Sequence, residues 1–273
     1  MGEPESDLSR ELLERVFTWG RVLLSSLTSQ ETGVPGHSRA EIRRALRELV
    51  DGGRLRFADE GGSAWVEMGP LAPIRVGRCL VLVPAGREKE GVDPGDVPVS
   101  LLPGPAFGCG RHPTTRIALV LLEKALMPGG FLKPDLRDEA LDAGCGTGVL
   151  GIAAVRLGMT RALLVDNDPA AVDEAWKNAA ANRVVPRVRV TDKSLESLTQ
   201  SFSLILANLR GPTLHGLLPW LAGTLVPEGV LIVSGMRPDE TDRFIAAAAG
   251  AGFEILETAA AAGWGGAALA RTP

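Results

Sequence analysis

Three glycines at alternate positions form the clearest chemical signal in the sequence, in Leu141-Asp142-Ala143-Gly144-Cys145-Gly146-Thr147-Gly148. Glycine permits the backbone angles of a tight turn and, having no Cβ, lets a ligand approach the main chain. A short apolar stretch precedes the glycines and a helix-like stretch follows them, and the first N–H groups of a helix are available to a ligand. The pattern predicts a strand, a glycine loop and a helix that together bind a cofactor.

Two cofactors fit this loop. Gly146 to Gly151 matches the G-x-G-x-x-G pattern of nicotinamide enzymes, but a lone match of that kind is weak. S-adenosylmethionine is favoured because Asp142 lies two residues before the first glycine, where its carboxylate can hold the methionine ammonium, directly or through water. The glycines also begin at Gly144, two residues before the position at which the G-x-G-x-x-G match starts.

Two further carboxylates follow predicted strands. Asp166 ends the apolar stretch Leu163–Val165 about 20 residues after the loop, where an acidic residue accepts hydrogen bonds from ribose hydroxyls. Asp168 suits the role of cap for the next helix, which leaves Asp166 for the ribose. Asp192 follows the next strand, where the adenine amino group is expected, although a surface turn is an equal alternative.

A long motif precedes the glycine loop, in Pro103-Gly104-Pro105-Ala106-Phe107-Gly108-Cys109-Gly110-Arg111-His112-Pro113-Thr114-Thr115. It resembles the signature loop of the PrmA family of ribosomal protein L11 methyltransferases, P-G-x-A-F-G-T-G-x-H-P-T-T. Ala207-Asn208-Leu209 resembles the family's A-N-[IL] motif, and Val233-Ser234-Gly235 resembles a later strand end. The resemblance runs from Pro73 to the end of the chain and implies a class I methyltransferase that uses S-adenosylmethionine.

The signature loop has a physical interpretation. Phe107 can cover the cofactor, and Gly108 allows close backbone approach. Thr114 and Thr115 stand at a helix start, where hydroxyl and N–H groups can hold the methionine carboxylate. His112 is either a general base or, as we favour, a residue that fixes the loop by a hydrogen bond.

The resemblance implies Asn208 and Leu209 as catalytic residues that orient an amine nucleophile, with Asn208 also beside the cofactor. Methyl transfer from a sulfonium is an in-line displacement, so the enzyme mainly aligns the partners and removes water. An amine must lose a proton first, so activity is expected to rise with pH. The alternative is that Asn208 only caps a turn.

Three departures from the family pattern bear on the substrate. Residues 1–70 do not show the alternating strands and helices of the family's ferredoxin-like amino-terminal domain. Arg210 stands where the family has a small residue, and it would favour an anionic substrate. Cys109 replaces a threonine, and Trp264 in the glycine-rich tail either lines the acceptor pocket or closes the core.

The elements that must position these residues follow from periodicity. Helices are expected at 114–126, 149–157, 170–181, 214–225 and 240–251, and strands at 140–143, 162–165, 188–190, 204–207, 230–234, 253–257 and, weakly, 267–270. The short alanine runs 246–249 and 259–262 suggest no more than helical or flexible patches. Repeated β-α units predict an α/β fold with a Rossmann-like, mostly parallel sheet of seven strands, and ligands at the strands' carboxyl ends.

The amino-terminal part reads as a small α+β winged-helix-like domain. Helices are expected from Leu8 to about Leu27 and over Arg39–Val50, the second capped by Ser38 with Glu41, and Gly52-Gly53 ends it. A hairpin of Arg54–Phe57 and Ala64–Met68 follows. Arginines on this helix and hairpin could touch phosphates, but interleaved acids favour a docking or core-covering role. The predicted organisation is residues 1–70, a connector 71–105 holding one clear strand, Cys79–Val83, and a catalytic domain 106–273.

Composition narrows the function classes. A net charge of -4 gives no overall attraction to nucleic acid or anionic membrane, and no apolar run reaches the ~20 residues of a membrane span. The acidic, polar start resembles neither a signal nor a transit peptide. Three scattered cysteines argue against a disulfide framework or zinc site and fit the cytoplasm.

The sequence therefore predicts a cytoplasmic S-adenosylmethionine-dependent methyltransferase acting on an amine of a protein, with a ribosomal or translation-related substrate first. A small-molecule or RNA methyltransferase is one alternative. A non-catalytic nucleic-acid-binding regulator that retains the fold is another. A nicotinamide dehydrogenase is remote, because the chain has no tyrosine for a Tyr/Lys pair.

Overall fold

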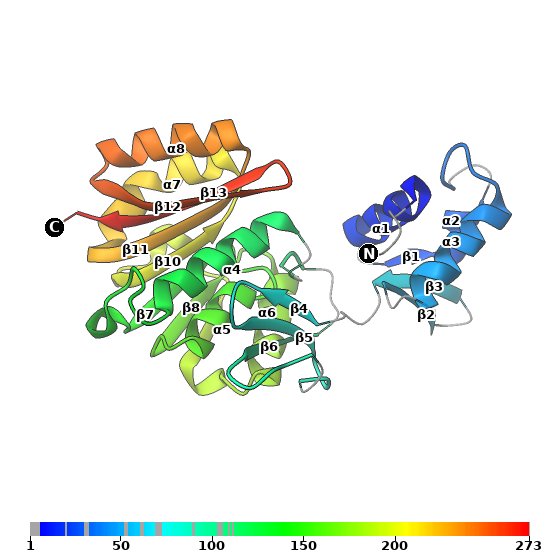
Figure 1. Ribbon diagram of the computed structural model, residues 1–273, viewed down its shortest axis with the longest axis horizontal. Helices are drawn as coiled ribbons and strands as arrows, with labels where there is room; N and C mark the ends of the chain where they lie inside the picture. The colour runs from blue at the N-terminus through cyan, green and yellow to red at the C-terminus, as the bar shows by residue number, and fades with distance from the viewer. Residues whose placement is uncertain are drawn as a thin grey trace. The chain divides into compact units, whose positions relative to one another are not determined.

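The computed structural model describes residues 6–19, 21–29, 33–51, 54–60, 63–68, 73–88, 91–102, 106–108, 110 and 112–272. They form two compact units, of which the first holds the described residues up to 68 and the second holds the described residues from 73 onward (Figure 1). Each unit is described separately below.

The first unit packs helices on a three-stranded antiparallel sheet of order β1-β3-β2. Its elements are α1 (Asp7–Trp19), β1 (Arg21–Leu23), α2 (Leu24–Thr28), α3 (Arg39–Asp51), β2 (Leu55–Glu60) and β3 (Ser63–Met68). Its core is built from apolar side chains of both helices and strands, such as Leu12, Leu46 and Val66. The expected hairpin is present, since β2 and β3 pair from Leu55↔Met68 to Glu60↔Ser63.

The prediction of one helix from Leu8 to about Leu27 is wrong. The first helix ends at Trp19, and Val22 pairs with Val66 as part of strand β1. Tertiary contacts explain the difference. Residues 21–23 pair with the exposed edge of the hairpin, and these backbone hydrogen bonds outweigh the local preference for a helix. The second helix is as expected, and the Ser38 hydroxyl accepts from the Glu41 amide while the Glu41 carboxylate accepts from the Ser38 amide. Gly52 and Gly53 lie outside the described residues.

The second unit is built on a seven-stranded sheet of order β12-β13-β11-β10-β7-β8-β9. Its strands are β7 (Glu139–Ala143), β8 (Arg161–Val165), β9 (Val188–Thr191), β10 (Phe202–Asn208), β11 (Leu225–Met236), β12 (Phe253–Ala261) and β13 (Trp264–Arg271). Five strands run parallel, and β13 pairs antiparallel with both β11 and β12. The predicted mostly parallel Rossmann-like sheet is confirmed.

Helices cover both faces of this sheet, which is why its central strands are mostly apolar. The helices are α4 (Pro113–Leu126), α5 (Val149–Arg156), α6 (Pro169–Ala181), α7 (Gly211–Thr224) and α8 (Pro238–Gly250). The first three pack on one face, and α7 and α8 pack on the other (Figure 1). Phe202 and Phe244 are fully buried in the core beneath α7 and α8. Among the described residues no helix has the length and apolar composition needed to cross a membrane.

Two parts of this unit differ from expectation. The predicted connector contains three strands rather than one, β4 (Ile74–Val76), β5 (Leu80–Pro84) and β6 (Val97–Leu101), which form a small sheet. Glu123 of α4 holds it, because its buried carboxylate accepts from the amides of Arg78, Cys79 and Leu80 at 2.6, 2.6 and 3.0 Å. The residues 259–261 extend β12 into a hairpin with β13 instead of forming a helical or flexible patch.

Candidate functional site

The glycine loop joins β7 to α5 at the carboxyl end of the parallel strands. The next strands in the chain lie on opposite sides of β7, with β8 on one side and β10 on the other. Such a reversal of strand order opens a crevice at the carboxyl edge, which is where ligands bind in open α/β sheets. Residues 142, 166 and 208, each at or near a strand end, therefore meet at one edge, as the sequence predicts.

The N–H groups of the glycine loop are all used by the protein itself. From Gly144 to Gly148, each of the five donates a hydrogen bond of 2.8 to 2.9 Å. Their acceptors, in chain order, are the Val165 carbonyl for the first two, an Asp166 carboxylate oxygen, the Phe107 carbonyl and the Cys145 carbonyl. These five residues therefore keep no N–H group for the pyrophosphate of a dinucleotide, which relies on such donors.

The glycines are required by conformation and by contact. Gly144, Gly146 and Gly148 have φ of +69°, +52° and +76°, values that side chains rarely adopt. A Cβ on Gly146 would lie 2.2 Å from the Phe107 carbonyl oxygen, and one on Gly148 would meet Ala175 of α6 at 3.1 Å. The loop is thus packed between the signature loop and α6, and its glycines let them approach.

Asp142 lies beneath the loop and is only 1% exposed. Its Oδ2 accepts from the Gly151 amide at 2.8 Å, and its Oδ1 is buried without a partner. Burial raises the pKa of Asp142 to about 7, and the nearby charge of Asp166 adds to the rise. The expected contact with a methionine ammonium stays a prediction, and the unpaired oxygen is the atom that would make it.

Asp168 has the capping role that the sequence suggests, whereas the contact of Asp166 with a ribose stays a prediction. Asp168 caps α6, since its carboxylate accepts from the Ala170 amide at 2.9 Å. Asp166 instead follows β8 and accepts from the Gly146 amide at 2.9 Å, which places it on the glycine loop. Asp192 is exposed just after β9, the neighbouring strand in the sheet, so a carboxylate stands at each of two adjacent strand ends.

The signature loop lies directly on the glycine loop. The Phe107 carbonyl accepts from the Thr147 amide at 2.9 Å, while the Phe107 ring stays half exposed. Gly108 has φ +117°, and a Cβ there would lie 2.6 Å from the Thr147 hydroxyl. Phe107 and Gly108 thus lie beside the glycine loop, and their contact with a cofactor stays a prediction, whereas Cys109 lies outside the described residues.

His112 fixes this region as the cap of α4. Its Nδ1 lies 2.8 Å from the Thr114 hydroxyl and accepts from the Thr114 amide at 3.3 Å. Its ring contacts the edges of Phe107 and Trp264, and the Arg237 guanidinium lies 4.2 Å from the centre of the Trp264 ring. Burial, together with the charge of Arg237, lowers the pKa of His112. The favoured structural role of His112 agrees with this geometry.

Asn208 ends β10 beside the start of α4. Its Nδ2 donates to the Thr115 hydroxyl at 3.5 Å, and its Oδ1 is buried without a partner. Leu209 follows, with its amide bonded to the Ser234 carbonyl at 3.0 Å and its side chain against Gly144. Thr114 and Thr115 are buried, so their hydroxyl groups serve His112 and Asn208 in this structure. Arg210 is exposed immediately before α7.

Three buried side-chain atoms of this site have no partner: two are acceptors, and the third, the Thr147 hydroxyl, can donate or accept. The buried Oδ1 atoms of Asp142 and Asn208 have no partner, and Asp166 adds a partly exposed carboxylate. A buried acceptor without a donor costs about 1–3 kcal/mol, so such atoms commonly mark a place for a ligand that brings N–H groups or positive charge. The site therefore fits a cofactor with an ammonium and a sulfonium.

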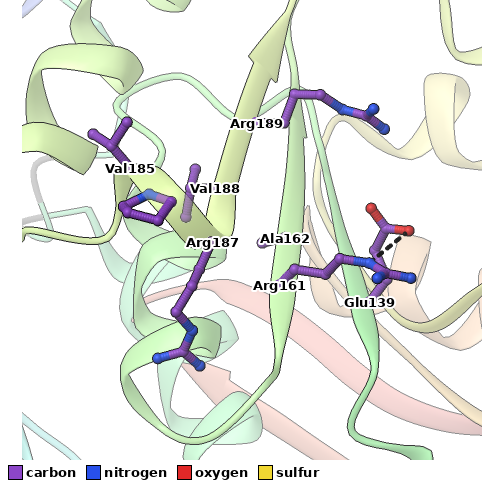
Figure 2. Close-up of a pocket in the computed structure, with 8 residues that line it drawn as sticks. Glu139, Arg161, Ala162, Val185, Arg187, Val188 and Arg189 are labelled. Atoms are coloured by element: carbon purple, nitrogen blue, oxygen red, sulfur yellow. Dashed lines mark ion pairs between the residues drawn. The ribbon is translucent and has the colours of Figure 1, made fainter.

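A separate cavity lies at the opposite edge of the sheet, where β7, β8 and β9 begin (Figure 2). Three arginines line it, and two are already engaged within the chain. Arg161 pairs with Glu139, as the dashed line in Figure 2 shows, and Arg187 donates to the Thr160 carbonyl at 2.9 Å. The arginine side chains point in different directions rather than toward one centre, so we place the candidate site at the glycine loop.

Sequence reasoning missed three buried polar residues, Glu174 and Asn178 on α6 and Asn182 at its C-cap. Their side chains bond to the segments on both sides of residues 103–105 and to the glycine loop. The available signal was their four-residue spacing on a helix face otherwise made of alanines, which places polar groups where only apolar ones are expected.

Comparisons with known proteins agree with this geometry. A family model described as ribosomal protein L11 methyltransferase (PrmA) matches residues 45–272. Ribosomal protein L11 methyltransferases of Pelotomaculum thermopropionicum and Pelobacter propionicus are 35% and 37% identical over 82% and 76% of this chain. The chain spans 66% and 65% of their lengths, just under two thirds. The crystal structure of a ribosomal protein L11 methylase from Lactobacillus delbrueckii subsp. bulgaricus, 30% identical, matches with a TM-score of 0.65 over 74% of this chain and 100% of that chain.

Proposed function

Since the chain belongs to the ribosomal protein L11 methyltransferase (PrmA) family, we propose that it transfers a methyl group from S-adenosylmethionine to an amine of a ribosomal protein. Ribosomal protein L11 is the first candidate substrate, because that is what its relatives are named for. A cytoplasmic location fits such a substrate.

The observation that carries the proposal is the balance of hydrogen-bonding groups at the glycine loop. The loop's own N–H groups are occupied, whereas two buried acceptors, on Asp142 and Asn208, have no donor. A dinucleotide needs donors at this point, and an amino acid ammonium needs acceptors. The two unpaired acceptors thus support S-adenosylmethionine, which brings an ammonium group, in agreement with the family match.

Each residue then has a role consistent with its position. Asp166 would bind the ribose and Asp192 the adenine, from adjacent strand ends. Asp142 would hold the ammonium, and the first turn of α4 at Thr114 and Thr115 would hold the carboxylate, where the helix dipole favours negative charge. When bound, the cofactor supplies an electrophilic methyl group.

Asn208 would orient the acceptor amine. Its unpaired Oδ1 can accept a hydrogen from the substrate amine, while its Nδ2 is held by Thr115. The Leu209 backbone carbonyl would accept a second hydrogen and complete the alignment. The exposed Arg210 beside them would favour an acceptor that lies next to acidic groups.

Calorimetric titration of the 273-residue chain with S-adenosylhomocysteine tests the cofactor, with NAD as the alternative ligand. The product should bind, NAD should not, and Asp166→Ala should abolish or strongly weaken binding. Asp168→Ala is the matched control, because it removes a carboxylate two residues away whose observed bonds are local to this turn. Binding of NAD instead, or equal effects of the two variants, would refute the assignment.

A labelled-methyl assay then tests the acceptor. Purified ribosomal protein L11 should gain label that resists RNase and is lost when wild-type enzyme is replaced by Asn208→Ala. In a parallel reaction with whole ribosomes, label found only in RNA would replace the protein substrate with the RNA alternative.

A further inference from the structure

Helix α6 and its C-cap residue carry three buried polar side chains on one face, four residues apart. Glu174, Asn178 and Asn182 are 7%, 0% and 6% exposed, and residues at this spacing share one side of a helix. Buried polar groups are costly unless they are hydrogen-bonded, so this face of α6 has a specific partner. The partner is main chain rather than another side chain.

Each of the three holds a different stretch of backbone. Asn182 bonds both main-chain groups of Ser100, accepting from its amide at 2.8 Å and donating to its carbonyl at 2.6 Å. The Asn178 Oδ1 accepts from the Leu102 amide at 2.8 Å. Glu174 accepts from the Ala106 amide at 2.9 Å. These three side chains therefore hydrogen-bond to the main chain on both sides of residues 103–105, where the signature loop begins.

Asn178 alone reaches the glycine loop as well. Its Nδ2 donates to the Thr147 carbonyl at 2.9 Å, and the amide of the same Thr147 donates to Phe107 in the signature loop at 2.9 Å. A continuous series of hydrogen bonds thus connects Leu102, Asn178, Thr147 and Phe107. Only a side chain with one donor and one acceptor can make both bonds of Asn178, which the amide provides.

We propose that Asn178 is a positioning residue that sets the signature loop in register with the glycine loop, and that cofactor affinity depends on this register. Asn178 acts through Thr147, because it is fully buried and makes no contact that would place it among the cofactor's ligands. Its neighbour Asn182 anchors the same segment without touching either loop. The part of this inference that concerns cofactor affinity rests on the proposed function, and the part that concerns the register of the two loops does not.

This contrast supplies a matched pair of variants. Asn178→Ala and Asn182→Ala remove the same group from the same face of one helix, and both should lower the melting temperature. Asn178→Ala should also weaken S-adenosylhomocysteine binding by about tenfold or more, the effect of losing ~1.4 kcal/mol, whereas Asn182→Ala should leave the dissociation constant nearly unchanged. Asn178→Asp, which keeps the acceptor for Leu102 but loses the donor to Thr147, should weaken binding as Asn178→Ala does.

Hydrogen exchange gives a readout that needs no cofactor. The Thr147 amide donates to the Phe107 carbonyl, and this bond should depend on the register of the two loops. The amide should therefore exchange faster in Asn178→Ala than in Asn182→Ala, because only the first variant removes the donor to the Thr147 carbonyl. Equal exchange in the two variants, or unchanged affinity in Asn178→Ala with a lowered melting temperature, would overturn the proposal. If the wild-type protein fails to bind S-adenosylhomocysteine, the proposed function fails, and the exchange contrast still decides the positioning role.

Discussion

Asp142 is an ionisable side chain held in the interior, and this couples the stability of the protein to pH. Burial raises the pKa of Asp142 to about 7, well above the value near 4 of an unfolded chain. The folded state therefore holds a proton that the unfolded state releases between about pH 4 and about pH 7. The contribution of this group to the free energy of unfolding is present below that window and is lost as pH rises through it.

Asp142→Asn should reduce this pH dependence, because the amide keeps an oxygen for Gly151 but cannot ionise. Between pH 5 and pH 8 the free energy of unfolding of the wild-type protein should fall further than that of the variant, by on the order of 2 kcal/mol. Urea denaturation of both proteins without cofactor measures the difference. Parallel pH curves for the two proteins would show that Asp142 does not titrate in this range.

Asn208 presents the other unpaired acceptor, and its loss should affect catalysis more than folding. Asn208→Ala should lower kcat by about 100-fold, the usual scale for removal of a group that orients the reacting atoms, with a smaller change in the KM for S-adenosylmethionine. Steady-state kinetics with the protein substrate measures both constants.

Thr115→Val is the matched control for that experiment. It removes the hydroxyl that accepts from Asn208 Nδ2 while leaving Oδ1 in place, so kcat should fall less than in Asn208→Ala. A variant Asn208→Ala with nearly full kcat would reduce Asn208 to the turn cap considered at first.

At the scale of elements, the glycine loop and the signature loop pack backbone against backbone, so a side chain added between them should separate them. Gly146→Ala would place a Cβ 2.2 Å from the Phe107 carbonyl, at a φ of +52°. The two loops must separate to accommodate it, so binding of S-adenosylhomocysteine should fall below detection by calorimetry even if the fold survives. Circular dichroism of the same sample reports on the fold.

Gly216→Ala is the control for a glycine without such a constraint. It lies within α7, nothing is within 4 Å of its added Cβ, and alanine favours a helix by up to about 1 kcal/mol. The melting temperature should stay the same or rise and binding should be unchanged. Intact binding in Gly146→Ala would contradict the close packing of the two loops.

The elements that sequence alone could predict are those with a strong local pattern. Apolar strands followed by helices are read from periodicity, so β7 to α8 were expected within a few residues. The strands that were missed are β1, β4 and β6, of three to five residues. Such strands exist because of partners elsewhere in the chain, as Val22 does through Val66, and no local window contains that information.

The candidate site divides in the same way. Residues at strand ends, such as Asp166 and Asn208, could be placed because parallel strands bring their carboxyl ends together. The hydrogen bonds of Asn178 could not be predicted, because an asparagine on an alanine-rich helix gives no indication of which residues it bonds to. The direct pairing of Thr147 with Phe107 likewise joins residues 40 positions apart and follows only from the folded loops.

At the scale of the whole molecule, the family match and the signature motifs concern mainly the second unit. The resemblance read from the sequence begins at Pro73, and the family model begins within α3 at residue 45. The first unit nevertheless has a core of its own, which includes Leu12 and Leu46 and shares no residue with the core around Phe244. The chain thus combines two separately packed bodies, and the candidate cofactor site lies in one of them.

This organisation predicts two separable unfolding transitions. A ligand stabilises only the structure whose unfolding releases it, so S-adenosylhomocysteine should raise the melting temperature of the second unit and leave that of the first unchanged. Leu46→Ala and Phe244→Ala assign the transitions, because each removes a fully buried side chain from one core at a cost of about 2–5 kcal/mol. Leu46→Ala should lower only the transition that the ligand does not move. A single calorimetric transition lowered by both variants and raised as a whole by the ligand would mean instead that the two units unfold together, and the first unit would then contribute to cofactor binding through stability.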